Sequence, residues 1–175
     1  MEVRFEPVAP EGAGDPDLRA QLLRLWVAVT DAGGSVGFTA PAPVDEIRAV
    51  LDAALARVAD CRDSLGVLRR GGDVVGMGVL VDRGSHLCQH WRTVLRVMVD
   101  PALQGSGAGT VLMHGLHELG RDLGLDHLQL TVRDGQHLER FYERFGYTVV
   151  GHHPGAVRVQ PGDDRDEIMM VAPLH

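Results

Sequence analysis

The chain has 175 residues, of which 45% are hydrophobic and 23% charged, a balance that excludes a disordered or fibrous protein and suits one globular domain over residues 1–175. Its 17 arginines oppose 24 acidic residues, and the net charge of −7 disfavours a broad grip on nucleic acid or on an anionic membrane. The sequence shows neither the ~20 consecutive apolar residues of a membrane-spanning helix nor a secretory signal, so we expect a cytoplasmic protein with no nucleic-acid or membrane partner.

Hydrophobic spacing and turn residues divide the first half of the chain into a strand, two helices and a hairpin. The predicted elements, in chain order, are a strand at Val3–Val8, a helix from Asp15-Pro16 to about Val29, an apolar loop from Gly33 to Pro43, a helix from about Val44 to Ala59, and strands at Leu65–Leu68 and Val74–Val81. The last two strands are joined at Arg70-Gly71-Gly72-Asp73, whose glycines predict a hairpin turn.

The second half is predicted to contain four strands and two helices. In chain order they are a central strand at Thr93–Val99, a glycine-rich turn at Gln104–Gly109 leading into a helix that ends at Gly124, a strand at His127–Val132, a short helix around Leu138–Phe145, and strands at Tyr147–Gly151 and Glu167–Ala172. The complete order is β-α-α-β-β-β-α-β-α-β-β, which predicts a mixed, seven-stranded α/β sheet.

Cysteine and histidine spacing does not indicate a metal site. Cys61 and Cys88 have no paired ligand spacing, and we expect both to be reduced thiols. His86, Cys88 and His90 alternate on one short segment, which is not a common zinc spacing and suits a surface hairpin better. The absence of lysine and asparagine, whose codons are rich in A and T, is typical of a GC-rich bacterial gene.

The turn at Gln104–Gly109 is the first segment that predicts chemistry. Its glycines let the backbone approach a ligand, and the turn runs directly into a helix N-terminus, so its amides form a ring of donors that suits a phosphate group. The turn is neither a Walker loop nor the dinucleotide fingerprint. Glycine at a strand–helix junction also serves geometry alone, so the turn by itself leaves both interpretations open.

Two segments together resemble a known superfamily. Val97-Met98-Val99-Asp100-Pro101, followed by the turn, resembles the acetyl-CoA segment of the GNAT superfamily of N-acetyltransferases, whose pattern is Arg/Gln-x-x-Gly-x-Gly/Ala. A second element of the superfamily, Phe141–Tyr147, follows the next predicted strand. The resemblance implies the GNAT fold, in which the sheet splays between strands 4 and 5.

A looser resemblance links the chain to one subgroup. The loop Gly33–Phe38, the strand Val97-Met98-Val99 and the stretch Val150–Gly155 are similar to the tabtoxin-resistance acetyltransferases, which acetylate an amine on a small toxin. This likeness implies a small amine as the acceptor.

The superfamily resemblance implies acetyl-CoA as the acyl-donor co-substrate and assigns roles to individual residues. The pyrophosphate of the cofactor would lie on the amides of the turn, and the pantetheine arm would pair with the backbone of Val97 and Val99, either of which is expected to donate to the oxyanion. Tyr142 occupies the usual position of the proton donor to the departing thiolate. The implied cofactor-binding residues are Val97, Val99, Gln104, Gly105, Ser106, Gly107, Ala108, Gly109, Thr110 and Tyr142.

The acceptor side is expected to contain Gly34, Ser35, Val36, Phe38, Thr93 and Thr131. The two threonines stand where tabtoxin-resistance enzymes place carboxylates, and neither can act as a base. Gly135 stands where many relatives carry an asparagine seven residues before the tyrosine. The chain thus departs from the subgroup at the positions that would activate the amine.

The general base is therefore open at the level of sequence. Asp134 ranks first, since strand ends beside the splay face the thioester, and His86, His90, His152 and His153 are weaker candidates. An acceptor amine of low pKa would need no base.

Three functions remain open: acetylation of a small-molecule amine by direct aminolysis of the thioester, acetylation of a protein or peptide amine, and acyl-CoA binding with weak catalysis. The apolar loop Gly33–Pro43 and the glycine- and proline-rich segment Pro154–Gly162 are expected to close over a small pocket, which favours the first. Tyr142 favours an enzyme over a binding module. The resemblance also implies a possible homodimer.

Overall fold

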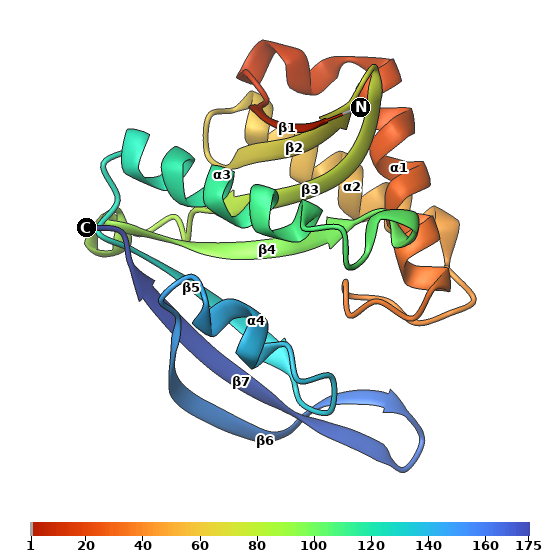
Figure 1. Cartoon of the computed structure of the whole chain (residues 1–175), viewed down its shortest axis with the longest axis vertical. Coiled ribbons are helices and arrows are strands. Elements are labelled where there is room, and N and C mark those ends of the chain that lie inside the picture. The colour runs from red at the N-terminus through yellow and green to blue at the C-terminus, as the bar shows by residue number, and fades with distance from the viewer. Residues whose placement is uncertain (1) are drawn as a thin grey trace.

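The computed structural model describes residues 2–175, which form one mixed sheet of seven strands in the order β1-β2-β3-β4-β5-β7-β6 (Figure 1). The strands are β1 (Val3–Pro7), β2 (Ser64–Arg70), β3 (Asp73–Val81), β4 (Trp91–Val99), β5 (His127–Arg133), β6 (Thr148–Gln160) and β7 (Asp163–Pro173). The α-helices are α1 (Pro16–Asp31), α2 (Val44–Ala59), α3 (Ala108–Asp122) and α4 (Glu139–Glu143). Three short 3-10 helices lie at Pro10–Gly14, His86–Cys88 and Pro101–Leu103. The predicted fold class and element order are confirmed.

The C-terminal hairpin differs from its prediction. Strand β6 continues from Thr148 to Gln160 and β7 begins at Asp163, so most of the segment expected as a loop at Pro154–Gly162 belongs to β6. Because β6 is the edge strand, the missing N–H of Pro154 does not interrupt a ladder on both sides. A register shift between His153 and Val157 accommodates the proline and glycine.

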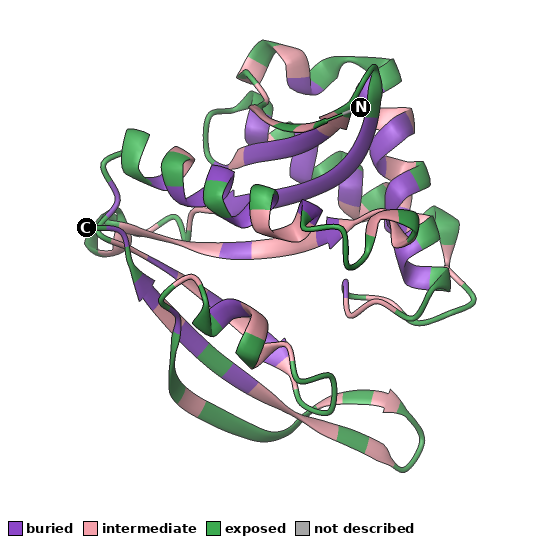
Figure 2. Ribbon diagram, viewed as in Figure 1, coloured by how far each residue is buried: buried purple, intermediate pink, exposed green. Residues whose placement is uncertain are grey.

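Two apolar cores cover the two faces of the sheet unequally. Helices α1 and α2 pack against one face of the β1–β4 half, around Trp26, Leu22 and Met77. On the other face, α3 and α4 join both halves in one cluster that contains Leu112 and Leu130. Figure 2 shows the buried residues concentrated between these layers. In the described chain, no helix covers the β5–β7 half on the face of the sheet where α1 and α2 cover the other half. Buried residues alternate with half-buried ones along β5.

The parallel pair β4–β5 separates along its length. Pairing is limited to Trp91, Arg92 and Thr93, which face His127, Leu128 and Gln129. Beyond Thr93 the strands diverge, and the sheet opens as a V between them (Figure 1). The expected splay between strands 4 and 5 is therefore confirmed. Among residues 2–175, no helix has the length and apolar character needed to cross a membrane.

Candidate active site

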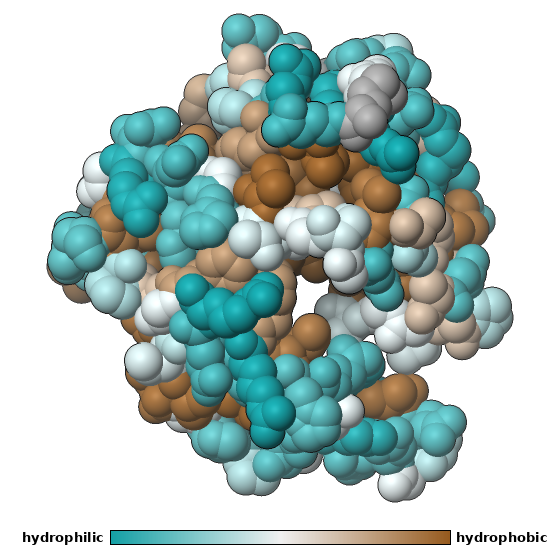
Figure 3. Space-filling model, in the orientation of Figure 1, coloured by the Kyte–Doolittle hydropathy of each residue, from teal (hydrophilic) through white to brown (hydrophobic). Residues whose placement is uncertain are grey.

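A cleft of about 1630 Å³ occupies the opening of the sheet. Figure 3 shows the surface hollowed between the upper body of the molecule and the β6–β7 hairpin. Most of the lining comes from the α1–α2 loop 32–41, residues 94–99 of β4, most of the turn 103–110, residues 130–133 of β5, Phe141 and Tyr142 of α4, and residues 157–159 of β6. The cleft therefore joins the predicted cofactor turn to the predicted acceptor loop.

The turn before α3 presents free amides toward this cleft. Gly105 and Gly107 have φ values of +78° and +89°, and Gly107 is the N-cap residue directly before α3. No acceptor among the described residues receives the amide hydrogens of Gly105, Gly107, Ala108 or Gly109. Unpaired amides at a helix N-terminus suit a phosphate group, so these residues fit the pyrophosphate of coenzyme A.

Ser106 has a different role in the same turn. Its amide donates to the carbonyl of Leu103 at 3.2 Å, and its hydroxyl donates to the same oxygen at 2.6 Å. Ser106 and Ala108 do not line the cleft, whereas Gln104, Gly105, Gly107, Gly109 and Thr110 do. The two hydrogen bonds of Ser106 thus stabilise the turn, in which the neighbouring glycine amides stay unpaired.

Strand β4 has a free edge along the cleft. Val97 and Val99 line it, while their side chains pack against the core beneath α3. Because β5 pairs only as far as Thr93, the backbone groups of β4 that face β5 beyond this point have no strand partner. This edge fits an extended, amide-bearing ligand that adds to the sheet as a strand would.

Two tyrosines lie near each other and have different surroundings. Tyr147 is 1% exposed, and its hydroxyl is hydrogen-bonded to His117 Nε2 at 3.3 Å. Tyr142 is 8% exposed and lines the cleft, and its hydroxyl has no hydrogen-bond partner in the described chain. Burial raises the pKa of Tyr142 to about 12, so this phenol is protonated at neutral pH.

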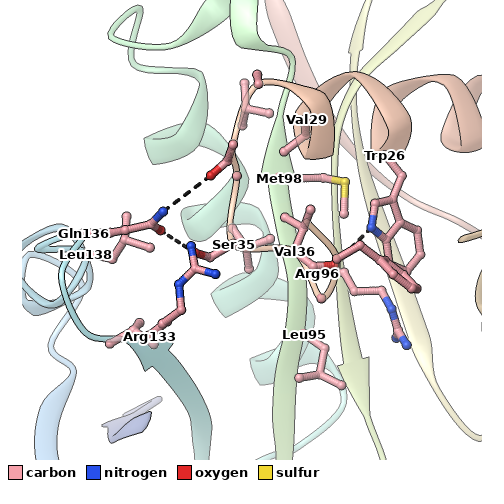
Figure 4. Close-up of a pocket in the computed structure, with 18 of the residues that line it drawn as sticks. Trp26, Val29, Ser35, Val36, Leu95, Arg96, Met98, Arg133, Gln136 and Leu138 are labelled. Atoms are coloured by element: carbon pink, nitrogen blue, oxygen red, sulfur yellow. Dashed lines mark hydrogen bonds between the residues drawn. The ribbon is translucent and has the colours of Figure 1, made fainter. Parts of the chain in front are cut away.

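The acceptor loop is held in place from α1. Gly33, with φ of +85°, ends the helix, and Gly34 donates to Val29 O at 2.9 Å in a space too small for a side chain. The Trp26 indole then donates to Val36 O at 3.0 Å (Figure 4). These contacts direct the loop over the cleft.

Gln136 ties this loop to the opposite side of the cleft (Figure 4). The Ser35 hydroxyl donates to Gln136 Oε1, and Gln136 Nε2 donates to Gly33 O at 3.4 Å. The two segments are 101 residues apart in the chain, and sequence reasoning did not detect their contact.

The structure brings most of the predicted acceptor residues together. Gly34, Ser35, Val36, Phe38 and Thr131 line the cleft. Thr93 does not, because it lies at the closed end of the V, where its hydroxyl donates to Gln129 Oε1 at 2.9 Å.

None of the candidate bases lines the cleft. Asp134 is exposed and its Oδ1 accepts from the Gly135 amide at 2.7 Å, and the four candidate histidines also lie outside the lining. The carboxylates that do line it are Glu46 and Glu167, which sequence reasoning missed. The half-buried Glu167 on β7 lies opposite Arg133 on β5 in the strand register, so the two side chains share a face of the sheet. Only this register, which the sequence does not show, places Glu167 at the cleft.

An asparagine at position 135 would require a rearrangement of its surroundings. The φ of Gly135 is +91°, and a Cβ atom there would collide with Nη1 of Arg165.

His86 and Cys88 lie on a 3-10 helix between β3 and β4, and both cysteines are free. No metal-binding group of three or more His, Cys, Asp or Glu residues occurs within residues 2–175.

A splayed parallel pair, a turn of free amides and a buried tyrosine together define the class of α/β acyltransferases. The chain belongs to the acetyltransferase (GNAT) family, whose model matches residues 22–147. It is therefore an N-acetyltransferase, and acetyl-CoA is its co-substrate.

Solved structures share the fold at low sequence identity. A putative acetyltransferase from Salmonella typhimurium, solved with its cofactor acetyl-CoA, has a TM-score of 0.76 and 20% identity over 100% of this chain and 94% of its own. An aminoglycoside 6'-N-acetyltransferase complexed with coenzyme A has a TM-score of 0.74 and 16% identity, covering 100% and 98%. The ribosomal-protein-S18-alanine N-acetyltransferase from Escherichia coli has a TM-score of 0.71 and 15% identity, covering 99% and 94%. No curated protein matches the chain by sequence.

Proposed function

We propose that the chain transfers the acetyl group of acetyl-CoA to the amine of a small molecule. The fold leaves the acceptor open, since the similar structures include an aminoglycoside and a ribosomal-protein acetyltransferase. The proposal rests on the hydrogen bonds of Gln136 with Ser35 and Gly33. They hold the α1–α2 loop to the segment after β5, across the cleft. An extended peptide needs an open groove at this place, whereas a small molecule fits beneath the loop.

The residues of the cleft divide the work of aminolysis. The amides of the turn 104–110 bind the pyrophosphate, and the free edge of β4 at Val97 and Val99 orients the pantetheine arm and offers an amide to the oxyanion. Acetyl-CoA supplies an activated thioester when bound.

Tyr142 holds its proton at Oη and directs it toward the departing sulfur. A thiolate has an ordinary pKa of ~8.5, and the burial that raises the pKa of Tyr142 also raises that of a thiolate formed beside it. The thiolate thus becomes a better proton acceptor, which supports transfer from the phenol.

For the base, Glu167 ranks ahead of Asp134 because it lines the cleft on the acceptor side. A carboxylate there attracts the ammonium form of the acceptor and takes a proton from it directly or through water. The tabtoxin-resistance subgroup and the homodimer stay predictions.

The test is release of coenzyme A from acetyl-CoA with a panel of small amines, with intact-mass detection of acetylated proteins and peptides as the control. We expect small amines to accelerate release and polypeptides to remain unmodified. Acetylation of peptides alone would establish a protein acceptor, and tight acetyl-CoA binding without acceleration by any amine would establish a binding module.

A further inference from the structure

The cleft has a charge opposite to that of the whole chain. Its charged lining residues are four cations, Arg96, Arg133, Arg144 and Arg158, and two carboxylates, Glu46 and Glu167. The cleft is therefore net positive in a chain whose net charge is −7. This concentration of arginine attracts an anionic ligand.

Two of the three arginines other than Arg96 have a hydrogen-bond partner, and the third lies opposite a carboxylate in the strand register. Arg158 forms a double hydrogen bond with Asp164 at 2.6 and 2.7 Å. Arg144 lies beside the cofactor turn, with Nη2 3.4 Å from Thr110 Oγ1. Arg133 faces Glu167 across the β5–β7 ladder.

Within the described chain, Arg96 has neither a hydrogen-bond partner nor a carboxylate opposite it in the strand register. It lies in a bulge of β4, where it and Val97 together face the single β3 residue Gly78, and its φ is +56°. Its guanidinium stands 5.2 Å from the ring centroid of Trp26, on the side of the sheet that carries the acceptor loop (Figure 4). Trp26 is buried and fixed to Val36, so the guanidinium has a defined position.

The guanidinium of Arg96 keeps its hydrogen-bond donors free within the described chain. The guanidinium carbon lies over the indole ring, and the five N–H donors lie in the plane of the guanidinium. Among the described residues, Arg96 donates no hydrogen bond and forms no ion pair. Burial lowers the pKa of Arg96, and the negative charge of Asp63 opposes this effect only in part. A half-buried cation with unused donors is costly unless a ligand supplies the acceptor.

We infer that the acceptor amine also bears a carboxylate or a similar planar oxyanion, and that Arg96 binds this group through the edge of its guanidinium. The inference rests on the proposed function, since it names the class of small molecule. The planar fork of arginine matches a carboxylate with two parallel hydrogen bonds. Glu167 lies on the other wall of the V, so the cleft offers an anion for the ammonium group and a cation for the acid.

The experiment compares matched acceptors in the wild type and three variants. The probes are α-, β- and γ-amino acids and the primary amides of the same compounds, measured by coenzyme A release at saturating acetyl-CoA. The variants are Arg96→Met, which keeps the length but removes the charge, Arg96→Lys, which keeps the charge but removes the fork, and Arg83→Met. Arg83 is the matched control, since its guanidinium stacks 5.5 Å from the Trp91 ring and does not line the cleft.

We expect the wild type to prefer an acid over its amide by about tenfold to a hundredfold in kcat/KM, the range of a charge-assisted hydrogen bond. Arg96→Met should abolish this preference, Arg96→Lys should keep part of it, and Arg83→Met should keep all of it. The affinity for acetyl-CoA, measured by calorimetry, should be unchanged in every variant, which also shows that each is folded.

Equal use of acids and amides by the wild type would overturn the inference and leave small-molecule acetylation standing. An equal loss of both in Arg96→Met would overturn it in the same way. If no amine is acetylated, the proposed function fails. The role of Arg96 is then tested separately, by measuring how the N-acetyl acids and N-acetyl amides bind to the coenzyme A complex. Binding of the acids that Arg96→Met loses would support the role of Arg96, and absence of binding in the wild type would overturn it.

Discussion

At the scale of single residues, the surroundings of the hydroxyl group assign different roles to the two neighbouring tyrosines. Tyr147 is satisfied by His117, whereas Tyr142 presents an unpartnered hydroxyl to the cleft. Both lie in the same motif, so composition does not distinguish them. The difference lies in what each hydroxyl contacts, and this makes Tyr142 the group that can donate a proton.

Tyr142→Phe should slow acyl transfer by about a hundredfold and leave stability and acetyl-CoA affinity nearly unchanged. The ring that packs in the core is kept, and the removed hydroxyl has no hydrogen bond in the described chain. Single-turnover kinetics at saturating acetyl-CoA measure the effect. In the control Tyr147→Phe, loss of the His117 contact should cost about 1 kcal/mol of stability while folded enzyme keeps its rate. A wild-type rate in Tyr142→Phe would exclude the proton-donor role.

At the scale of elements, helix α3 has a left-handed glycine at each end. Gly107 directly precedes the helix with φ of +89°, and Gly124 follows its end with φ of +71°. A Cβ atom at either position would meet no heavy atom within 4 Å, so the main cost of a substitution at either is backbone strain. Only Gly107 lines the cleft, and the pair therefore separates strain from ligand binding.

Gly107→Val and Gly124→Val should each lose about 1–2 kcal/mol of stability, the cost of a left-handed side-chain-bearing residue. Only Gly107→Val should lose acetyl-CoA binding, because its side chain stands where a phosphate must approach the free amides. Calorimetric titration of both folded variants measures this. If Gly107→Val keeps its affinity for acetyl-CoA, the turn does not hold the pyrophosphate.

At the scale of the whole molecule, the two halves of the sheet are joined by three β4–β5 pairs and by the continuous core under α3 and α4. His117 of α3 lies in this joint, against Tyr147 and Phe145 of the second half. Burial, with smaller contributions from Arg121 and His114, lowers the pKa of His117 to about 4. The imidazole is therefore neutral at pH 7, and its protonation opposes the packing of the two halves.

The free energy of unfolding should fall as the pH is lowered from about 6.5 to 4, because the unfolded chain, with an ordinary histidine pKa of ~6.5, binds the proton first. The contribution of His117 is about 3 kcal/mol over this window. Urea denaturation at several pH values measures it, and His117→Gln should flatten the slope by that amount. His114→Gln, on the exposed side of the same helix, is the matched control. Equal slopes in wild type and His117→Gln would show that this histidine does not limit acid stability.

Much of the architecture follows from local patterns in the sequence. Apolar spacing predicted the boundaries of α2, and the sequence also predicted the order of strand, glycine turn and helix at α3. The predicted extent of the C-terminal strands was wrong. Proline and glycine at Pro154–Gly162 are typical of loops, but an edge strand tolerates them. The residues of the acceptor loop Gly33–Phe38 were predicted from a resemblance, and they do line the cleft.

The sequence by itself thus determined most of the elements, their order and the glycine turn before α3, since each depends on residues that are close in the chain. Only the tertiary structure decided which side chains meet across the cleft. The bulge places Arg96 against Trp26, the β5–β7 register places Glu167 beside Arg133, and Gln136 reaches Ser35 across 101 residues. These contacts depend on strand register and on packing between distant segments, and no local pattern encodes either one.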